Sequence, residues 1–348
     1  MTPKILLHGS GAIGTIYVYL LHKAGYDITA VCRSNYAAAK QDGFLLDSDR
    51  YGKGIRFRPK VVRSLDEAAQ DRPYDYVLIA TKAIPNSETS KTIEPVVTKC
   101  RTTIALLQNG IGIEDEYLER FPINPLLSCV LYLPTTQIKP GHIQMGQVEL
   151  LEVGAFPASS YHAKPNVKDA ADQFMEILKT AGSNVKWYDD IQEKRWNKLL
   201  LNAPWNPICA LTLSRDVAFL ESSDVADKVV LEVMHEVVAV SQALGYTSVT
   251  AEGAQKALKS IKGRIGQVGI EPSMLVDILN GRRMEVDTIL GNPVKIARGL
   301  GIEVPRMEML YALNKGLDEA VALREPGQSL AGDKTKTQIP KNEGRSAL

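Results

Sequence analysis

The chain has 348 residues and is 45% hydrophobic, which is enough for two domains, each with a core of its own. Its 41 basic and 40 acidic residues balance, so the charge favours neither nucleic acid nor an anionic membrane as a partner. Neither the 4 cysteines nor the 5 histidines show metal-binding spacing, and no apolar run reaches the roughly 20 residues of a membrane span, so we expect no metal site and no membrane helix.

The first predicted element is an apolar strand over Lys4–His8. A glycine-rich turn follows it, then a helix ending near Lys23 and a second strand over Ile28–Cys32. This order within about 30 residues is typical of a dinucleotide-binding Rossmann fold. The first two glycines of such a turn allow a tight bend close to a pyrophosphate, and the third lets the helix pack closely on the strand. We therefore predict a cofactor site formed by Gly9, Ser10, Gly11, Ala12, Ile13 and Gly14.

Arg33, directly after the second strand, indicates which nicotinamide cofactor the site prefers. An acidic residue at this position would bind the ribose 2′-hydroxyl and repel a 2′-phosphate, whereas a guanidinium followed by Ser34 suits a phosphate. We therefore predict NADPH. The alternative is that Arg33 is an ordinary surface arginine.

Three further buried strands are expected over Tyr74–Ala80, Thr103–Leu107 and Leu126–Tyr132. Ligands of open parallel sheets bind outside the carboxyl ends of the strands, so Lys82 and Asn109 fall on the predicted cofactor edge. Taken alone, Lys82 would be interpreted as a plain surface lysine at a strand end, and Asn109 could simply be a turn residue.

The rest of the first domain is expected to hold a hairpin over Gln137–Gly154, which turns at Pro140-Gly141. A loop over 155–165, a helix over Asn166–Ala181 and a strand over Asn184–Trp187 complete it.

From about residue 189 the pattern changes to long helical periodicity. Further helices are expected over Pro272–Leu279, Met284–Arg298 and Arg306–Leu323, and one long apolar helix face is marked by Val225, Val229, Val233, Val237, Val240 and Leu244. We predict an α/β Rossmann domain over 1–188, an all-α domain for substrate binding and dimerisation over 189–326, and a polar disordered tail over 327–348.

The stretch from Glu193 to Pro207 is mostly apolar but carries Lys198, Asn202 and Asn206 at a spacing of four. On a helix these residues line one narrow stripe, which would be costly to bury without partners and which suits a polar ligand. The alternative for Lys198 is a side chain that extends from a buried helix to solvent.

Together these residues resemble the ketopantoate reductase (2-dehydropantoate 2-reductase) family. The resemblance covers positions 9 to 287. Beyond the glycine motif and Arg33 it rests on Thr81-Lys82-Ala83, Gln108-Asn109-Gly110, Lys198-Leu199, Asn202, Asn206-Pro207, Pro272-Ser273-Met274-Leu275 and Glu285-Val286-Asp287. It implies a Rossmann domain, a helical domain and the NADPH-dependent reduction of a 2-oxo acid to a 2-hydroxy acid.

The resemblance also implies roles for single residues. Lys198 would be the general acid that protonates the carbonyl oxygen, and Glu285 would maintain the reactive geometry. The substrate would be bound by Asn202, Asn206 and Ser273, and cofactor or substrate would be contacted by Lys82 and Asn109. The alternatives are a solvated face beside Arg282 and Arg283 for Glu285, and a plain helix start for Ser273.

Departures from the family pattern lie on the substrate side. Asp216 stands near a position where the family often has an asparagine, and Leu290-Gly291 replaces an asparagine-glycine pair. Pro204 predicts a kink, and Pro207 biases Asn206 away from helical angles, so we expect the stripe to fail at its end.

These departures leave two alternatives to 2-dehydropantoate reduction. One is the same chemistry on another carbonyl or imine, and the other is a non-catalytic NADPH-binding sensor. Apolar helix faces permit a homodimer. We expect a cytoplasmic location; the alternative is peroxisomal, because Ser346-Ala347-Leu348 vaguely resembles a peroxisomal address.

Overall fold

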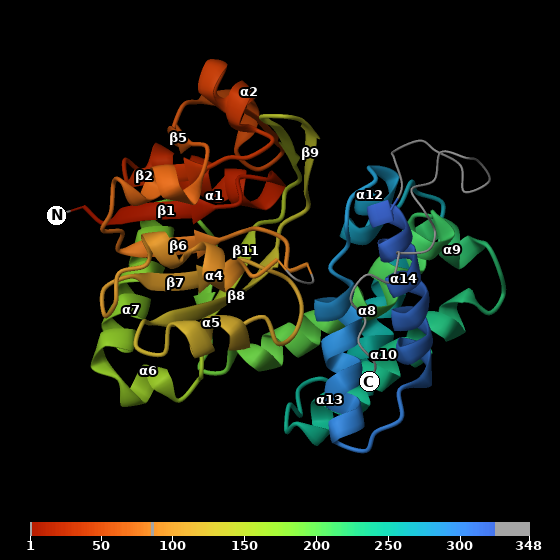
Figure 1. Cartoon of the computed structure of the whole chain (residues 1–348). Helices are drawn as coiled ribbons and strands as arrows, with labels where there is room; N and C mark the ends of the chain where they lie inside the picture. The colour runs from red at the N-terminus through yellow and green to blue at the C-terminus, as the bar shows by residue number, and fades with distance from the viewer. Residues whose placement is uncertain (1, 85–86, 324–348) are drawn as a thin grey trace. The chain divides into compact units, whose positions relative to one another are not determined.

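The computed structural model describes residues 2–84 and 87–323 (Figure 1). The chain divides into two compact units, Met1–Arg195 and Trp196–Leu348. The division falls inside helix α8 (Ile191–Thr212), a few residues beyond the predicted boundary at 188/189. The predicted fold class is confirmed, because a parallel-rich sheet with helices is followed by a helical unit. The predicted tail, 327–348, lies outside the described residues.

The first unit is built on an eight-stranded sheet in the order β12-β11-β8-β7-β6-β1-β2-β5. Neighbouring strands from β5 to β8 run parallel, and β11 runs antiparallel to β8. The central strands β1, β6 and β7 are seen one above another in Figure 1. The bounds are β1 (Lys4–His8), β2 (Asp27–Val31), β5 (Lys60–Val62), β6 (Tyr76–Ile79), β7 (Thr103–Leu106), β8 (Leu126–Tyr132), β11 (Leu150–Ala155) and β12 (Val185–Trp187).

Helices cover both faces of this sheet. On one face α1 (Ala12–Lys23) and α7 (Pro165–Thr180) share a core with Leu7. On the other face α3 (Leu65–Ala69), α5 (Asp115–Arg120) and the 3-10 turn η1 (Glu94–Val96) share a core with Leu6. Successive residues of a strand point to opposite faces, so Leu6 and Leu7 serve different cores. The short helices α2 (Tyr36–Gln41), α4 (Thr89–Thr92) and α6 (Ser160–Ala163) complete the unit, and α6 lies within the segment that we predicted as a loop.

A second, four-stranded sheet, which the sequence did not predict, has the order β4-β3-β10-β9. Its strands are β3 (Phe44–Ser48), β4 (Gly52–Phe57), β9 (Thr135–Lys139) and β10 (His142–Met145). The predicted hairpin is confirmed as β9–β10, with Gly141 in the turn at φ 77°. Its predicted extension to Gly154 is wrong, because the apolar residues of β11 bury against the core of the main sheet instead.

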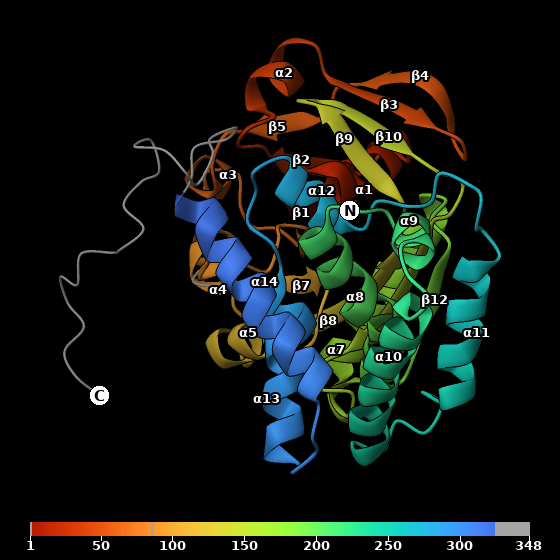
Figure 2. The same ribbon diagram turned by 90° about the vertical axis from the view of Figure 1, so that its right-hand side faces the viewer.

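The second unit is helical, with α10 packed against α9, α11, α13 and α14. Figure 2 shows α10 beside α13 and α14. After α8 the bounds are α9 (Asp216–Glu221), α10 (Ala226–Ala243), α11 (Ala251–Lys262), α12 (Ser273–Leu279), the π-turn η2 (Asp287–Gly291), α13 (Asn292–Gly299) and α14 (Pro305–Leu323). Among the described residues, no helix has the length and hydropathy that crossing a membrane requires.

Two predictions for this unit need correction. Val225 and Val229 are exposed, because steps of four residues drift around a helix of 3.6 residues per turn; Val230 and Met234 are buried instead. Leu244 is exposed because it is the C-cap of α10, beyond the last helical turn. The helix predicted over Met284–Arg298 is divided into η2 and α13, and it begins only after Glu285.

Candidate active site

The glycine-rich loop after β1 can be built only with glycine at two of its positions. Gly9 has φ 104°, and a Cβ there would lie 2.5 Å from the backbone N of Thr81. A Cβ on Gly14 would lie 2.2 Å from the carbonyl oxygen of Gly9, so this glycine lets α1 pack against the loop. At Gly11 nothing lies within 4 Å of the Cβ position, and the loop is therefore open there.

The groups around this opening suit an anionic, hydrogen-bonding ligand. No side chain caps α1, which starts directly after Gly11, so side chains leave its first N–H groups available to an anion. The buried atoms His8 Nδ1 and Thr81 Oγ1, beside Gly9, have no hydrogen-bond partner within the described part of the chain. Ser10 differs from its neighbours, because its hydroxyl donates to Val31 O at 3.0 Å inside the loop.

Arg33 lies exposed just past the end of β2. Burial, and after it the positive charge of Arg33, lowers the pKa of His8 to about 4.

Asn35 is a residue of this site that the sequence reasoning missed. Its side-chain amide donates to Ser10 O at 2.6 Å and to Gln137 Oε1 at 2.9 Å, and its Oδ1 accepts from Gly141 N at 3.2 Å. Asn35 therefore ties the glycine loop to the β9–β10 hairpin. The available signal was its place two residues after Arg33.

The loops that carry Lys82 and Asn109 are joined to each other. Gln108 Nε2 donates to Thr81 O at 2.9 Å, and Tyr117 OH donates to Gln108 Oε1 at 3.3 Å. Lys82 and Asn109 are both partly buried. The structure therefore brings together, at the carboxyl ends of β2, β1, β6 and β7, the residues predicted from four separate segments.

Helix α8 carries the predicted stripe without interruption. Lys198 and Asn202 are partly buried and Asn206 is buried, all within Ile191–Thr212. The expectation that the helical geometry fails near Asn206 is wrong, because α8 continues through both Pro204 and Pro207. The apolar side chains around them, among them Trp205 and Ile208, are buried, and this packing offsets the hydrogen bonds that the prolines cannot form.

Asn206 and Ser273, predicted from distant segments, are in direct contact. Asn206 Oδ1 accepts from Ser273 Oγ at 2.9 Å and from Met274 N at 3.2 Å. Asn206 thus satisfies an N–H group at the start of α12, whose N-cap residue, Pro272, forms no side-chain cap. Ser273 itself is exposed, and its hydroxyl oxygen keeps lone pairs with which to accept a further hydrogen bond.

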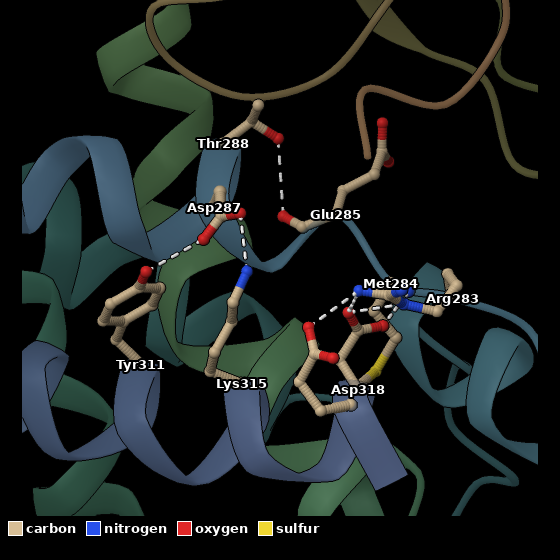
Figure 3. Close-up of polar contacts among 9 residues, drawn as sticks. Arg283, Met284, Glu285, Asp287, Thr288, Tyr311, Lys315 and Asp318 are labelled. Atoms are coloured by element: carbon tan, nitrogen blue, oxygen red, sulfur yellow. Dashed lines mark hydrogen bonds and ion pairs between the residues drawn. The ribbon is translucent and has the colours of Figure 1, made fainter. Parts of the chain in front are cut away.

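Hydrogen bonds to the backbone of Glu285 and of the preceding residue fix the position of Glu285 (Figure 3). Met284 N donates to Asp318 Oδ1 at 2.7 Å, and Thr288 Oγ1 donates to Glu285 O at 3.4 Å. Figure 3 shows the Glu285 carboxylate directed away from Asp318 and Lys315. Since Glu285 is only 6% exposed, the alternative of a solvated face is wrong for this residue.

The departure from the family pattern at Leu290-Gly291 lies in the π-turn η2, which begins at Asp287. Asp287 accepts from Tyr311 OH at 2.9 Å and from Lys315 Nζ at 2.8 Å (Figure 3). A Cβ on Gly291 would lie 2.8 Å from the Tyr311 ring, so this glycine lets η2 lie against α14. Leu290 is fully buried, and no amide side chain is present at this point.

Asp216, the other departure, is a structural residue. It is 4% exposed and pairs with Arg264 at 2.6 Å. Its Oδ1 also accepts from Val217 N and Ile270 N, at 2.8 and 2.7 Å. The negative charge of Asp216 is thus compensated by Arg264 inside the second unit.

Two family models match the chain. The model described as ketopantoate reductase PanE/ApbA matches residues 5–158, and the model of its C-terminal part matches residues 190–318.

Individual relatives extend over nearly the whole chain. An uncharacterized protein of Saccharomyces cerevisiae is 32% identical over 337 residues, covering 89% of this chain and 92% of that protein. A 2-dehydropantoate 2-reductase of a Nostoc species is 28% identical over 318 residues, covering 90% and 95%. The crystal structure of 2-dehydropantoate 2-reductase from Methylococcus capsulatus is 30% identical with a TM-score of 0.79, covering 95% of this chain and 100% of that one. The chain therefore belongs to the ketopantoate reductase family of oxidoreductases.

Proposed function

We propose that this protein reduces a 2-oxo acid, 2-dehydropantoate or a close analogue, to the 2-hydroxy acid with NADPH. The observation that supports NADPH as the cofactor is the glycine-rich loop after β1, which lies beside Thr81 and is open at Gly11, with Arg33 just past the end of β2. The names of the Nostoc and Methylococcus relatives support the substrate class.

NADPH would lie across the carboxyl ends of β1, β2, β6 and β7 and would supply a hydride to the carbonyl carbon. The first turn of α1 would bind the pyrophosphate and Arg33 the 2′-phosphate. His8 Nδ1 and Thr81 Oγ1, which have no hydrogen-bond partner among the residues described, offer further polar contacts. Lys82 and Asn109 would contact the cofactor or the substrate at the same sheet edge.

Lys198 is proposed as the general acid. Negative charge develops on the carbonyl oxygen as the carbon is reduced, and an ammonium group stabilises that charge and then supplies the proton. Asn202 and Ser273 would bind the substrate's carboxylate and hydroxyl groups. Asn206 would hold the Ser273 hydroxyl in place, and Glu285 would act from its fixed backbone position.

A second candidate is the same reduction on another carbonyl or imine. It is favoured by Leu290-Gly291, where the buried leucine supplies no amide in place of the family's asparagine. A cytoplasmic location and a homodimer, both expected from the sequence, stay predictions.

The test follows NADPH absorbance with a panel of 2-oxo acids of increasing size. Turnover of 2-dehydropantoate or a close analogue is expected, and turnover of bulky substrates alone would favour the second candidate. NADPH binding without turnover of any carbonyl would refute the enzymatic function and favour the alternative of a non-catalytic NADPH-binding sensor.

The general acid is tested by Lys198→Ala, which should lower kcat by about 10²-fold with little change in NADPH affinity. Lys194→Ala is the matched control, because Lys194 lies one turn earlier on α8 and stacks over the Tyr188 ring at 4.5 Å. Equal kcat values for the two variants would exclude Lys198 as the acid.

A further inference from the structure

A buried ion pair joins the start of α8 to the loops of the first unit. Arg195 Nε lies 2.8 Å from Glu114 Oε1, and the two side chains are 2% and 1% exposed. Neither residue belongs to the predicted site.

The remaining contacts of the guanidinium bracket Asn109. Arg195 Nη1 donates to Gln108 O at 3.1 Å and to Gly110 O at 3.0 Å, the carbonyls on either side of Asn109. Arg195 Nη2 donates to Cys129 O at 3.1 Å, and Nε donates to Ser128 Oγ at 2.7 Å. One side chain thus connects the loop after β7, strand β8 and helix α8.

Glu114 extends the same network. Its Oε1 accepts from Ser128 Oγ at 2.6 Å and from Gln192 Nε2 at 2.8 Å. The first turn of α8 also approaches β11 closely, because a Cβ on Gly154 would lie 2.7 Å from Ile191 Cβ. The start of α8 is therefore fixed against the sheet both by the ion pair and by close packing.

Stability alone does not explain this arrangement. Desolvation of two charges offsets most of their attraction, and buried ion pairs are often replaced by apolar residues without loss. What the arginine adds is geometry, because its planar fork binds several acceptors in fixed directions, which a lysine cannot do.

We propose that Arg195 is a positioning residue that holds the Asn109 loop and the first turn of α8 as one block. Lys198 follows three residues later on the same helix. The inference rests on the proposed function, since it assigns the purpose of the block to Asn109 and Lys198. Loosening this block should misplace both residues, and misplacement by about 1 Å costs up to about 10²-fold in rate.

The test compares Arg195→Lys with Ser128→Ala. Arg195→Lys keeps the charge beside Glu114 but loses the fork, and Ser128→Ala keeps both charges and removes the hydroxyl between them. The control is Arg101→Lys, whose guanidinium forms an exposed ion pair with Asp75 at 3.0 Å. The measurements are Tm, kcat and KM for the 2-oxo acid, the Kd of NADPH by fluorescence, and amide hydrogen exchange of residues 108–113.

We expect Arg195→Lys to lower kcat/KM by about tenfold or more and to raise the NADPH Kd, at a temperature where the protein is folded. Exchange at residues 108–113 should become faster, Ser128→Ala should show smaller changes of the same sign, and the control should match the wild type. A lower Tm with unchanged kinetics and exchange would assign Arg195 a purely structural role and overturn the proposal.

Hydrogen exchange separates this proposal from the proposed function. If the wild type turns over no carbonyl, faster exchange in Arg195→Lys still supports the loop-holding role. Unchanged exchange refutes that role whether or not the protein is a reductase.

Discussion

Replacing Asp318 tests how the Glu285 segment is held in place. Asp318 is fully buried and accepts from Arg283 Nε at 2.8 Å and from Met284 N at 2.7 Å, directly before Glu285. The hydrogen bond to Asp318 raises the pKa of the Arg283 guanidinium, so Arg283 stays charged throughout the neutral range. Asp318→Asn keeps the shape of the side chain and removes its charge.

The expected loss is about 3 kcal/mol. Breaking a buried ion pair costs about 3–5 kcal/mol, and the lower end applies because the Arg283 side chain is 31% exposed and keeps some hydration. For a unit of this size, the loss corresponds to a Tm that is lower by roughly 10 °C.

The control variant is Glu319→Gln, because Glu319 pairs with the same guanidinium at 3.1 Å but is 56% exposed. An exposed pair contributes about 0–1 kcal/mol, so its Tm should fall by a few degrees at most. Thermal unfolding followed by circular dichroism compares the two variants. At 20 °C, where both are folded, Asp318→Asn should also lower kcat/KM, since the Glu285 backbone is no longer fixed. Equal Tm values for the two variants would refute this account of the segment.

Three further predictions concern cofactor binding, thiol reactivity and the pH dependence of stability. Arg33→Ala should weaken NADPH about tenfold or more while NADH binding changes little, as measured by fluorescence titration; equal losses would contradict a 2′-phosphate contact. A thiol reagent should add once to the native chain, at Cys100, because burial protects the other thiols and raises the pKa of Cys129 to about 12; a second adduct on the native protein, seen by mass spectrometry, would disprove this. The pKa of His8 is lowered from its usual 6.5 to about 4, so between these pH values the folded chain binds fewer protons than the unfolded chain. The contribution of His8 to the free energy of unfolding is therefore complete above pH 6.5 and falls by about 3 kcal/mol toward pH 4. Urea unfolding of His8→Leu should lack that part of the pH dependence, and an unchanged slope would show that His8 does not cause it.

Local sequence determined much of this protein. The order of strand, glycine turn, helix and strand from Lys4 onward predicted the Rossmann unit, because the φ of Gly9 and the close approach at Gly14 tolerate no side chain. Spacing along α8 placed Lys198 and Asn202 on one helix, since a regular helix converts sequence distance directly into position.

What only the tertiary structure decided are the contacts between residues far apart in sequence. The pairing of β10 with β3, the hydrogen bond between Asn206 and Ser273, and the ion pair of Arg195 with Glu114 each join separate segments. No local pattern encodes such a contact, because an arginine or an asparagine has the same intrinsic preferences whether it faces solvent or a distant carbonyl. Tertiary packing also determines that α8 stays helical at Pro204 and Pro207. An isolated helix would break there, and burial of the surrounding apolar side chains keeps α8 continuous.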